Sequence, residues 1–278
     1  MKNNIILEAK GGLANRMRVI VSGIWFAENF DKKVKLIWNI DSGLNSPFEE
    51  LFEPINNCTI VRKRFFYYFF RSTEQKTIFK QISIFIITKL LARRYFILED
   101  AGVKTKFKCE RGYENIVKGN KTLYLRTCEE FGGNGKNYNH FIPKPDIQKR
   151  IGYHSSFFNE KTIGVHIRRT DHSIAIQKSP IELFVERIKK DLACDPNCNY
   201  FLSTDDSETE ALLKKLFGEK IMVVEKKYSR NLQQGIIDAV VDLYCLSNTS
   251  KIYGSFGSSF SEVASQIKGI ELEKLHIQ

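Results

Sequence analysis

The chain has 278 residues, of which 42% are hydrophobic, 27% are charged and only 6 are proline. This is the composition of an ordinary globular protein, and it excludes a collagen-like, repetitive or disordered chain. The formal net charge is +11, but the excess lies in residues 1–150, which hold 27 basic and 15 acidic side chains, against 16 and 17 in residues 151–278. A chain of this length favours two domains.

The start of the chain and its apolar runs predict a soluble, cytoplasmic protein. Residues 1–8 enter a strand-like run at once and lack the apolar segment and cleavage site of a signal peptide. The uncharged run at residues 81–88 is far shorter than the roughly 18 residues that a membrane span needs. The six cysteines are therefore expected to be reduced, and the close pair Cys194 and Cys198 lacks the second ligand pair of a zinc site, so no metal is expected.

The N-terminal half begins with a strand, a helix and a strand, predicted at residues 4–9, 15–30 and 34–38, and then becomes irregular. Residues 62–108 hold 12 basic and 3 acidic side chains, interleaved with aromatic residues. Such a segment suits an anionic membrane surface, an acidic glycan or nucleic acid, although the aromatic side chains equally suit an ordinary core. No nucleic-acid-binding motif accompanies it, so we expect no nucleic acid partner and keep a peripheral contact with the inner face of the membrane as one interpretation.

The C-terminal half alternates strands and helices, which predicts a doubly wound parallel sheet. Strands are predicted at residues 162–167, 200–203, 220–224 and 251–253. Four helices alternate with them: one begins at residue 180, one ends at residue 217, one spans residues 234–246 and the last begins at residue 261. Ser179, Pro180 and Glu182 have the spacing of a capping box, and Gly218 lies where a helix C-cap belongs. The fold class is therefore α/β, with domains predicted at residues 1–155 and 156–278.

In open α/β sheets ligands bind at the carboxyl ends of strands, and the first predicted strand is followed by an unusual loop. Gly11 and Gly12 let the backbone approach a ligand closely, and Asn15 and Arg16 begin the next helix. Cations are disfavoured in the first turn of a helix, so Arg16 and Arg18 indicate a nearby anion. An ordinary connecting turn is the alternative interpretation.

Arg168 and Arg169 directly follow the uncharged strand at residues 162–167. The planar guanidinium group matches a phosphate through two parallel hydrogen bonds, so this pair predicts a diphosphate site. Asp171 is placed to orient one guanidinium, and His166 alternates with Arg168 along the strand, so both should face the same side. The alternatives are a structural salt-bridge cluster for the arginines and a hydrogen-bonded core residue for His166.

The next strand is followed by two carboxylates, Asp205 and Asp206. Asp206 or Ser207 is placed to cap the following helix, which leaves Asp205 to accept hydrogen bonds from a nucleoside. Asp238 and Asp242 lie four residues apart on one predicted helix, a like-charge spacing that needs a compensating cation or donor. Arg168, Arg169 or a ligand is expected to provide it.

A fourth loop, at residues 254–261, is rich in hydroxyl groups and leads from a strand into a helix. Its backbone amides and the hydroxyls of Ser258, Ser259 and Ser261 are suited to hold a phosphate at a helix N-terminus. A flexible linker is the alternative, which the flanking apolar elements disfavour.

Three ordered segments of the C-terminal half resemble the motifs of the fucosyltransferase superfamily, which includes the α1,6-fucosyltransferases, the nodulation fucosyltransferases and the protein O-fucosyltransferases. The segments are 166–171, with the pattern HxRRxD, 203–206, and 242–247 together with 255–261. Residues 11–18, with the pattern GGLxNR, resemble the N-terminal loop of related bacterial proteins, as do 36–41 and 47–52. The resemblance covers residues 3–55 and 160–267.

The resemblance implies a GT-B-like fold, in which two Rossmann-like domains face each other across a cleft and the C-terminal domain holds the donor GDP-fucose. It implies an inverting glycosyltransferase that transfers fucose to a glycan or lipid-linked acceptor and requires no metal or other cofactor. No Asp-x-Asp triplet occurs in the sequence, and Arg168 with Arg169 is suited to replace the divalent ion that such a triplet holds.

By the same resemblance, Arg168 contacts the diphosphate and assists its departure, while Arg169 and His166 shape the diphosphate site. Asp205 and Asp242 hold the nucleoside or the arginines. The complete predicted donor-binding set is Gly12, Asn15, Arg16, His166, Asp171, Asp205, Asp206, Asp242, Ser258, Ser259, Phe260 and Ser261.

The chain departs from the α1,6-fucosyltransferases just after the first motif, where those enzymes are thought to place a lysine and a glutamate that deprotonate the acceptor. Residues 172–178 contain no glutamate. An inverting transfer needs a group that accepts the proton of the acceptor hydroxyl, and His172 and Asp41 are the candidates. Late loss of the proton, in a reaction driven by the phosphate, is the alternative.

Two other interpretations stay open on the sequence. One is the same fold with a different nucleotide sugar, because the loops favour a diphosphate without specifying guanine or fucose. The other is a basic protein that binds nucleic acid or a membrane and has a vestigial cleft, which only the charge asymmetry supports.

Overall fold

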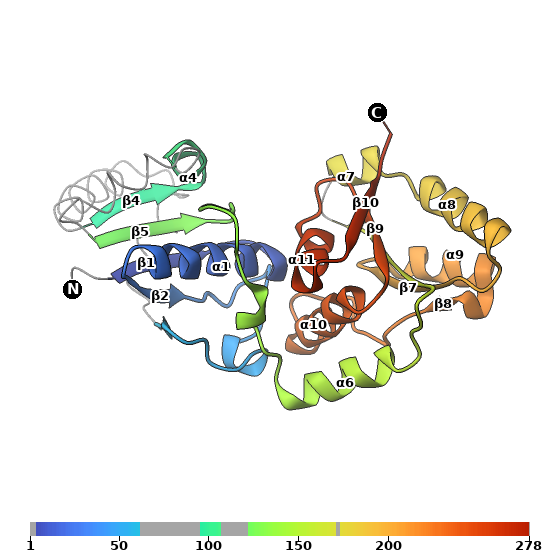
Figure 1. The fold of residues 1–278 in the computed structure, drawn as a ribbon, viewed down its shortest axis with the longest axis horizontal. Helices are drawn as coiled ribbons and strands as arrows, with labels where there is room; N and C mark the ends of the chain where they lie inside the picture. Colours follow the sequence, from blue (N-terminus) through green and yellow to red (C-terminus); the bar gives the residue numbers. More distant parts are fainter. Residues whose placement is uncertain (1–3, 62–94, 107–121, 171–172, 278) are drawn as a thin grey trace. The chain divides into compact units, whose positions relative to one another are not determined.

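The structure, a computed structural model, describes residues 4–61, 95–106, 122–170 and 173–277. The chain forms two compact units, each built on a five-stranded parallel sheet (Figure 1). The first unit consists of Met1–Asn39 and Pro54–His140, and the second of Ile40–Glu53 and Phe141–Gln278. A short segment from the N-terminal half, Ile40–Glu53, therefore packs as part of the unit that the C-terminal half builds.

The sheet of the first unit has the strand order β3-β2-β1-β5-β4, and all neighbouring strands are parallel. Its strands are β1 (Asn4–Ala9), β2 (Lys33–Ile37), β3 (Cys58–Ile60), β4 (Tyr95–Glu99) and β5 (Thr122–Thr127). Among the described residues of this unit, the helical segments are α1 (Leu13–Asn29), α4 (Asp100–Lys106) and the 3-10 turn η3 (Tyr138–His140). Helix α1 lies close against β1 because Gly23 has no side chain: a Cβ there would lie 2.0 Å from Cδ1 of Leu7.

The sheet of the second unit has the strand order β10-β9-β6-β7-β8, again with parallel neighbours. Its strands are β6 (Thr162–Ile167), β7 (Asn199–Thr204), β8 (Ile221–Met222), β9 (Lys251–Ser255) and β10 (Glu271–Leu275). Its helical segments are η1 (Phe48–Glu50), α6 (Pro145–Ser155), α7 (Ser173–Lys178), α8 (Ile181–Cys194), α9 (Ser207–Phe217), η4 (Gly218–Lys220), α10 (Gln233–Ser247) and α11 (Ser259–Lys268).

Helices cover both faces of this second sheet, as a doubly wound sheet requires. On one face Ile163, Val165 and Ile167 of β6 join a buried cluster with side chains of α8 and α9. On the opposite face a Cβ at Gly164 would meet Leu246 of α10 at 3.0 Å. Strand β6 is buried along its whole length, which explains why its sequence is an uncharged run up to Arg168.

All six predicted strands are present, and β1 and β6 have the predicted bounds. The predicted capping box at the start of α8 is wrong, because Pro180 itself occupies the cap position and no side chain caps that end. Ser179 is buried, and its hydroxyl donates to Leu275 O at 2.6 Å and accepts from Phe256 N at 2.8 Å. The Ser179 hydroxyl therefore forms hydrogen bonds with residues distant in sequence and does not cap α8.

The basic segment at residues 62–108 lies largely outside the described residues. Among the residues that are described, no helix is both long enough and apolar enough to cross a membrane.

Candidate functional site

The carboxyl ends of β6, β7 and β9 meet at one edge of the second sheet, because these parallel strands are neighbours. Main-chain amides of the loop after β6 join the three ends. The amide of Arg168 donates to Ser255 Oγ at 3.1 Å, and the amide of Arg169 donates to Asp205 Oδ1 at 2.7 Å. The structure therefore brings together the arginine, carboxylate and serine loops that were predicted to form one site.

Asp205 is the common partner of these charged groups. Its Oδ2 accepts a hydrogen bond from the Thr170 hydroxyl at 2.7 Å. Two guanidinium groups approach the same oxygen, Nε of Arg168 at 3.9 Å and Nη2 of Arg230 at 3.6 Å. Arg230 lies after β8 and was not predicted, because nothing in the local sequence marks it.

Arg169 makes a different set of contacts. Its guanidinium donates to Ser179 O at 3.0 Å and to Ile176 O at 3.5 Å, which fixes the connection between α7 and α8. Burial lowers the pKa of Arg169, although an arginine remains protonated at physiological pH. The contacts of Arg169 thus hold the neighbouring chain in place.

His166 is 5% exposed and stacks on Phe260, with the ring centroids 4.9 Å apart. Burial lowers its pKa to about 3, an effect that Asp205 opposes and Arg168 strengthens. The ring is therefore neutral at physiological pH. Its Nδ1 has no hydrogen-bond partner within the described part of the chain.

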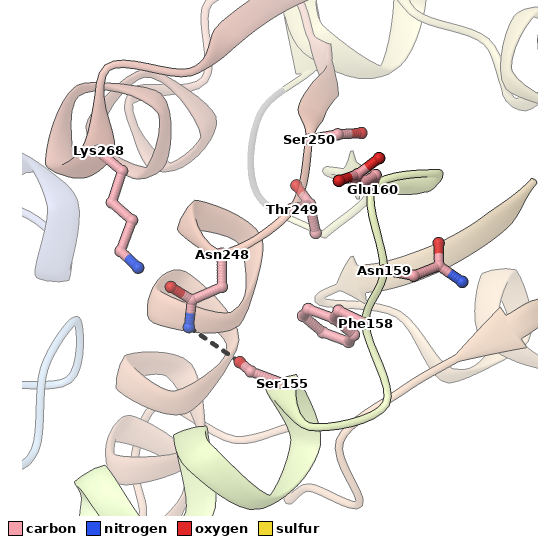
Figure 2. A pocket seen from close by; sticks show the side chains of 8 residues that line it. All are labelled: Ser155, Phe158, Asn159, Glu160, Asn248, Thr249, Ser250 and Lys268. Atoms are coloured by element: carbon pink, nitrogen blue, oxygen red, sulfur yellow. Dashed lines mark hydrogen bonds between the residues drawn. The ribbon is translucent and has the colours of Figure 1, made fainter.

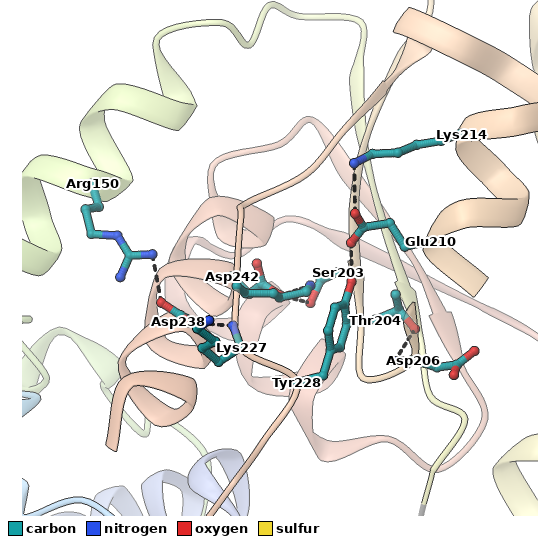
Figure 3. Close-up of polar contacts among 11 residues, drawn as sticks. Arg150, Ser203, Thr204, Asp206, Glu210, Lys214, Lys227, Tyr228, Asp238 and Asp242 are labelled. Carbon is teal, nitrogen blue, oxygen red and sulfur yellow. Dashed lines mark hydrogen bonds and ion pairs between the residues drawn. The ribbon is translucent and has the colours of Figure 1, made fainter. Parts of the chain in front are cut away.

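A buried ion pair lies behind this edge. Lys226 Nζ is 2.6 Å from Asp242 Oδ2, and the two charged side chains are 6% and 5% exposed. The same oxygen accepts from the Ser203 hydroxyl at 2.9 Å (Figure 3). Burial raises the pKa of Asp242, and Lys226 and Ser203 partly offset this effect. Oδ1 of Asp242 is buried without a hydrogen-bond partner among the described residues.

Asp238, four residues earlier on α10, has its own partners. Its carboxylate accepts from Arg150 at 2.8 Å and from the amide of Lys227 at 2.9 Å, two contacts that Figure 3 shows. It also accepts from the Gln234 side chain at 2.8 Å. The cations that compensate the like-charge pair on α10 are therefore Lys226 and Arg150. The expectation that Arg168 or Arg169 would do so is wrong, because both arginines are engaged at the end of β6.

The serine-rich turn begins α11 as predicted, with Ser258 at the cap position and no side-chain cap. Ser261 is fully buried and donates to Ser258 O at 3.2 Å. The buried hydroxyl of Ser258 has no hydrogen-bond partner within the described residues. An uncapped helix N-terminus with a buried, unused hydroxyl is suited to an anion. Ser259 and Phe260 follow in the first turn, half-buried.

Asp206, one of the two predicted candidates, caps α9. Its Oδ2 accepts from the amide of Thr209 at 2.8 Å and from the Thr209 hydroxyl at 2.6 Å. Burial raises the pKa of this carboxyl, but the hydrogen bonds from Thr209 outweigh it, so the net pKa is lowered. Asp206 is thus occupied by the helix, while Asp205 faces the arginines.

The glycine loop of the first unit places Gly12 at the N-cap of α1, without a side-chain cap, and half-buries Asn15. Arg16 is fully buried, donates to Gly11 O at 2.7 Å and to Asn39 O, and stacks over the ring of Trp38. Nε of Arg18 donates to the carbonyl of Cys128 at 2.9 Å. The two arginines that were expected to indicate a nearby anion therefore donate to main-chain carbonyls.

The predicted proton acceptors are only partly placed. Asp41 lies in the second unit, where its Oδ1 accepts from the amides of Gly43 and Leu44 at 2.9 and 3.1 Å and closes a tight turn. Asp171 and His172 lie outside the described residues.

No cluster of three or more His, Cys, Asp or Glu side chains suited to a metal occurs in the described part of the chain. A pocket of about 630 Å³ opens at the amino ends of β6 and β9, the edge opposite to the site (Figure 2). Its lining is mostly polar, and Asn248 donates to Ser155 Oγ there at 2.9 Å. The predicted site residues do not line it.

Two five-stranded parallel sheets flanked by helices, with charged loops at the carboxyl edge of the second, define a two-domain α/β protein with the fold of the GT-B fucosyltransferases. One such structure, NodZ alpha-1,6-fucosyltransferase soaked with GDP-fucose, matches 96% of this chain over 93% of its own length, with a TM-score of 0.63 and 15% identity. Fucosyltransferase NodZ from Bradyrhizobium gives a TM-score of 0.61 at 14% identity, covering 95% of this chain and 93% of its own.

Two other fucosyltransferase structures share the fold. FUT1 of Arabidopsis thaliana, in complex with GDP, covers 98% of this chain over 70% of its own length, with a TM-score of 0.63 and 15% identity. POFUT1 in complex with GDP-fucose covers 100% of this chain and 98% of its own, with a TM-score of 0.56 and 12% identity. No protein-family profile and no curated protein sequence matches the chain. At these identities the likeness establishes the fold.

Proposed function

We propose that the protein is an inverting glycosyltransferase that transfers fucose from GDP-fucose to a glycan or lipid-linked acceptor. The observation that carries this proposal is the grouping of Arg168, Asp205 and Ser255 at the carboxyl edge of the second sheet, where the Arg168 amide is hydrogen-bonded to Ser255 and its guanidinium lies at ion-pair distance from Asp205. It lies in a fold shared with fucosyltransferases whose structures contain GDP or GDP-fucose.

In this proposal Arg168 acts on the leaving group. As the bond between the sugar and GDP breaks, negative charge grows on the diphosphate, and a guanidinium fixed near that charge lowers the barrier to transfer. The amide of Arg168 is tied to Ser255, and its Nε lies 3.9 Å from Asp205, so the group is held before the donor arrives. A cation supplied by the protein would take the part that a divalent ion plays elsewhere.

The remaining residues would hold the donor. The uncapped start of α11, with Ser258, Ser259, Phe260 and Ser261, is suited to phosphate, and neutral His166 stacked on Phe260 provides an apolar wall. Asp205 and Asp242 offer carboxylate oxygens to the nucleoside. Asp41 and His172 remain our candidates for accepting the proton of the acceptor.

Replacing Arg168 by alanine tests the central role. We expect Arg168→Ala to reduce fucose transfer from GDP-fucose by at least ~100-fold, the scale of losing one fixed charge-stabilising donor. Lys189→Ala removes the same charge from an exposed position on α8 of the same unit and should leave transfer unchanged. Near-normal turnover in Arg168→Ala would contradict the proposed role.

The identity of the nucleotide is tested by thermal unfolding with GDP and with UDP. A ligand present at about 100 times its dissociation constant should stabilise the folded state by roughly 2.7 kcal/mol. We expect GDP to raise the melting temperature more than UDP at equal concentration. Stabilisation by UDP alone would overturn the assignment of GDP-fucose and favour another nucleotide sugar.

A peripheral contact with the inner face of an anionic membrane is also proposed, on the charge of residues 62–108. Co-sedimentation with anionic vesicles that weakens with added salt would support it. Equal binding to neutral and anionic vesicles would not.

A further inference from the structure

Ser179 connects α7 to α8 and is fully buried, although it does not cap α8. Its hydroxyl donates to the carbonyl of Leu275, at the end of β10, at 2.6 Å. The same hydroxyl accepts from the amide of Phe256, just after β9, at 2.8 Å. The Ser179 side chain therefore holds two segments that are far from it in the sequence.

The carbonyl of Ser179 holds the loop after β6. It accepts from Nη2 of Arg169 at 3.0 Å, and Nη1 of the same side chain donates to the carbonyl of Ile176 at 3.5 Å. The amide of Arg169 in turn donates to Asp205, at the end of β7, at 2.7 Å. Ser179 thus contacts the loop after β6 through its carbonyl and the loop after β9 through its hydroxyl.

The hydroxyl contact leads to Arg168 through one neighbouring residue. Phe256, whose amide donates to Ser179, directly follows Ser255 in the chain. Ser255 is fully buried, and its hydroxyl accepts from the amide of Arg168 at 3.1 Å. Because Ser179 holds the amide of Phe256, it also fixes the place of the Ser255 hydroxyl, which in turn holds the main chain of Arg168.

Lys178, the residue before Ser179, holds the same connection between α7 and α8. Its carbonyl accepts from the amide of Ile277 at 2.8 Å, and its ammonium lies 5.1 Å from the centre of the Phe256 ring. Loss of the Ser179 hydroxyl would leave the amide of Phe256 without its acceptor and the carbonyl of Leu275 without this donor. Polar groups that lose a partner in this way favour a shift of the chain, because a shift lets them find new partners.

We propose that Ser179 is a positioning residue for the donor site, which fixes the loops after β6 and β9 relative to each other. The inference rests on the proposed function, since those two loops are the ones assigned there to the diphosphate. Ser179 lies outside the motifs that resemble fucosyltransferases, and because it is fully buried it acts through the residues that it holds. Loops that are fixed in advance lose less entropy when a ligand binds.

Ser179→Ala removes only the hydroxyl and tests this role in titration calorimetry with GDP and with inorganic pyrophosphate. We expect both ligands to bind about 10-fold more weakly, the scale of one lost hydrogen bond. A purely structural role would lower stability in urea unfolding and leave the affinity of the folded protein unchanged. Thr162→Val is the matched control, because Thr162 is fully buried at the opposite end of β6 and its hydroxyl accepts from the amide of Asn159 at 2.9 Å. It should bind both ligands as the wild type does.

Hydrogen exchange measures the link between the two loops directly. In Ser179→Ala the amides of Phe256 and Arg168 should both exchange faster with solvent, although only Phe256 loses its acceptor, whereas Thr162→Val should change neither. Because coupling is reciprocal, pyrophosphate bound to the wild type should slow exchange of the amides of Ser179 and Ile277, which hold the connection between α7 and α8. This second measurement needs no variant, so it decides the question even if Ser179→Ala does not fold.

The outcomes separate this inference from the proposed function. If the wild type prefers GDP and Ser179→Ala binds GDP and pyrophosphate as tightly as the wild type, Ser179 does not position the site, whereas the donor assignment stands. If the wild type prefers UDP and Ser179→Ala loses affinity for UDP, the inference holds and the assignment of GDP-fucose fails. If the wild type binds none of the three ligands, both are overturned. Unchanged exchange at Ser179 and Ile277 when pyrophosphate binds would also contradict the inference.

Discussion

The protein should lose stability in mildly acidic solution because His166 is buried as a neutral imidazole. Burial lowers the pKa of His166 from 6.5 to about 3. In the unfolded chain the ring is solvated and its pKa returns to about 6.5. The unfolded state therefore binds more protons than the folded state between about pH 3 and pH 6.5, so the free energy of unfolding falls as the pH drops through this window and is fully retained above it.

The size of the effect can be worked out for pH 5.0. At that pH His166 is protonated in the unfolded chain and neutral in the folded one. The fall in the free energy of unfolding is therefore set by the 1.5 pH units between pH 5.0 and the pKa of His166 in the unfolded chain. At 1.36 kcal/mol per unit this is ~2 kcal/mol. The result depends little on the folded pKa, provided that it lies below about 4. A loss of this size is a substantial part of the 5–15 kcal/mol that is typical of a folded protein.

Urea unfolding at pH 7.5, 6.0 and 5.0 measures this loss, and His166→Gln isolates it. Glutamine is polar and similar in size but does not titrate, so the variant should lose ~2 kcal/mol less than the wild type between pH 7.5 and pH 5.0. Comparing pH slopes removes any constant effect of the substitution on stability. Identical slopes in the two proteins, or a folded-state pKa above 6 for His166 in an NMR titration, would refute the reasoning.

Two other substitutions test the structure around the site. Lys226→Met leaves Asp242 buried without its cation, so we expect the free energy of unfolding in urea to fall by about 3–5 kcal/mol. Adding Asp242→Leu removes the unpaired carboxylate, so the double variant should lose clearly less. Equal losses in the single and double variants would show that the ion pair is not the cause. Asp206→Ala removes the cap of α9 and should cost about 1 kcal/mol in thermal unfolding, whereas Asp206→Asn, which keeps an acceptor for the amide of Thr209, should retain most of that stability. An equal loss in both Asp206 variants would argue against the cap.

The fold was predictable wherever a strand is buried on both faces. The apolar runs that predicted β1 and β6 have bounds that agree with the structure. Strand β10 was missed because it lies at the edge of its sheet, where Glu271, Glu273 and Lys274 alternate with apolar residues and resemble the surface of a helix. At an edge, pairing with β9 decides the conformation, and a local pattern does not contain that information.

The site was predictable where its residues directly follow strands. Arg168 and Asp205 stand one residue beyond β6 and β7, so the parallel sheet alone brings them together. Lys226 and Arg230 lie on an irregular loop, whose position depends on hydrogen bonds to residues far away in the sequence. The sequence did predict that a cation lies near α10, because Asp238 and Asp242 are spaced as a like-charge pair. It did not identify Lys226 as that cation.

The arginines show why residue type and local position are not enough to assign a ligand. Arg16 and Arg169 were both expected near an anion, yet each donates to two main-chain carbonyls, which are neutral acceptors fixed by the fold. Arg168 and Arg230 instead approach one shared carboxylate at 3.9 and 3.6 Å. Carbonyl partners satisfy the directional donors of a guanidinium and explain its burial through folding alone. Arg168 and Arg230 place two guanidinium groups at the carboxyl edge of the second sheet, where ligands of open α/β sheets bind, and this is the feature of the site that suits a diphosphate.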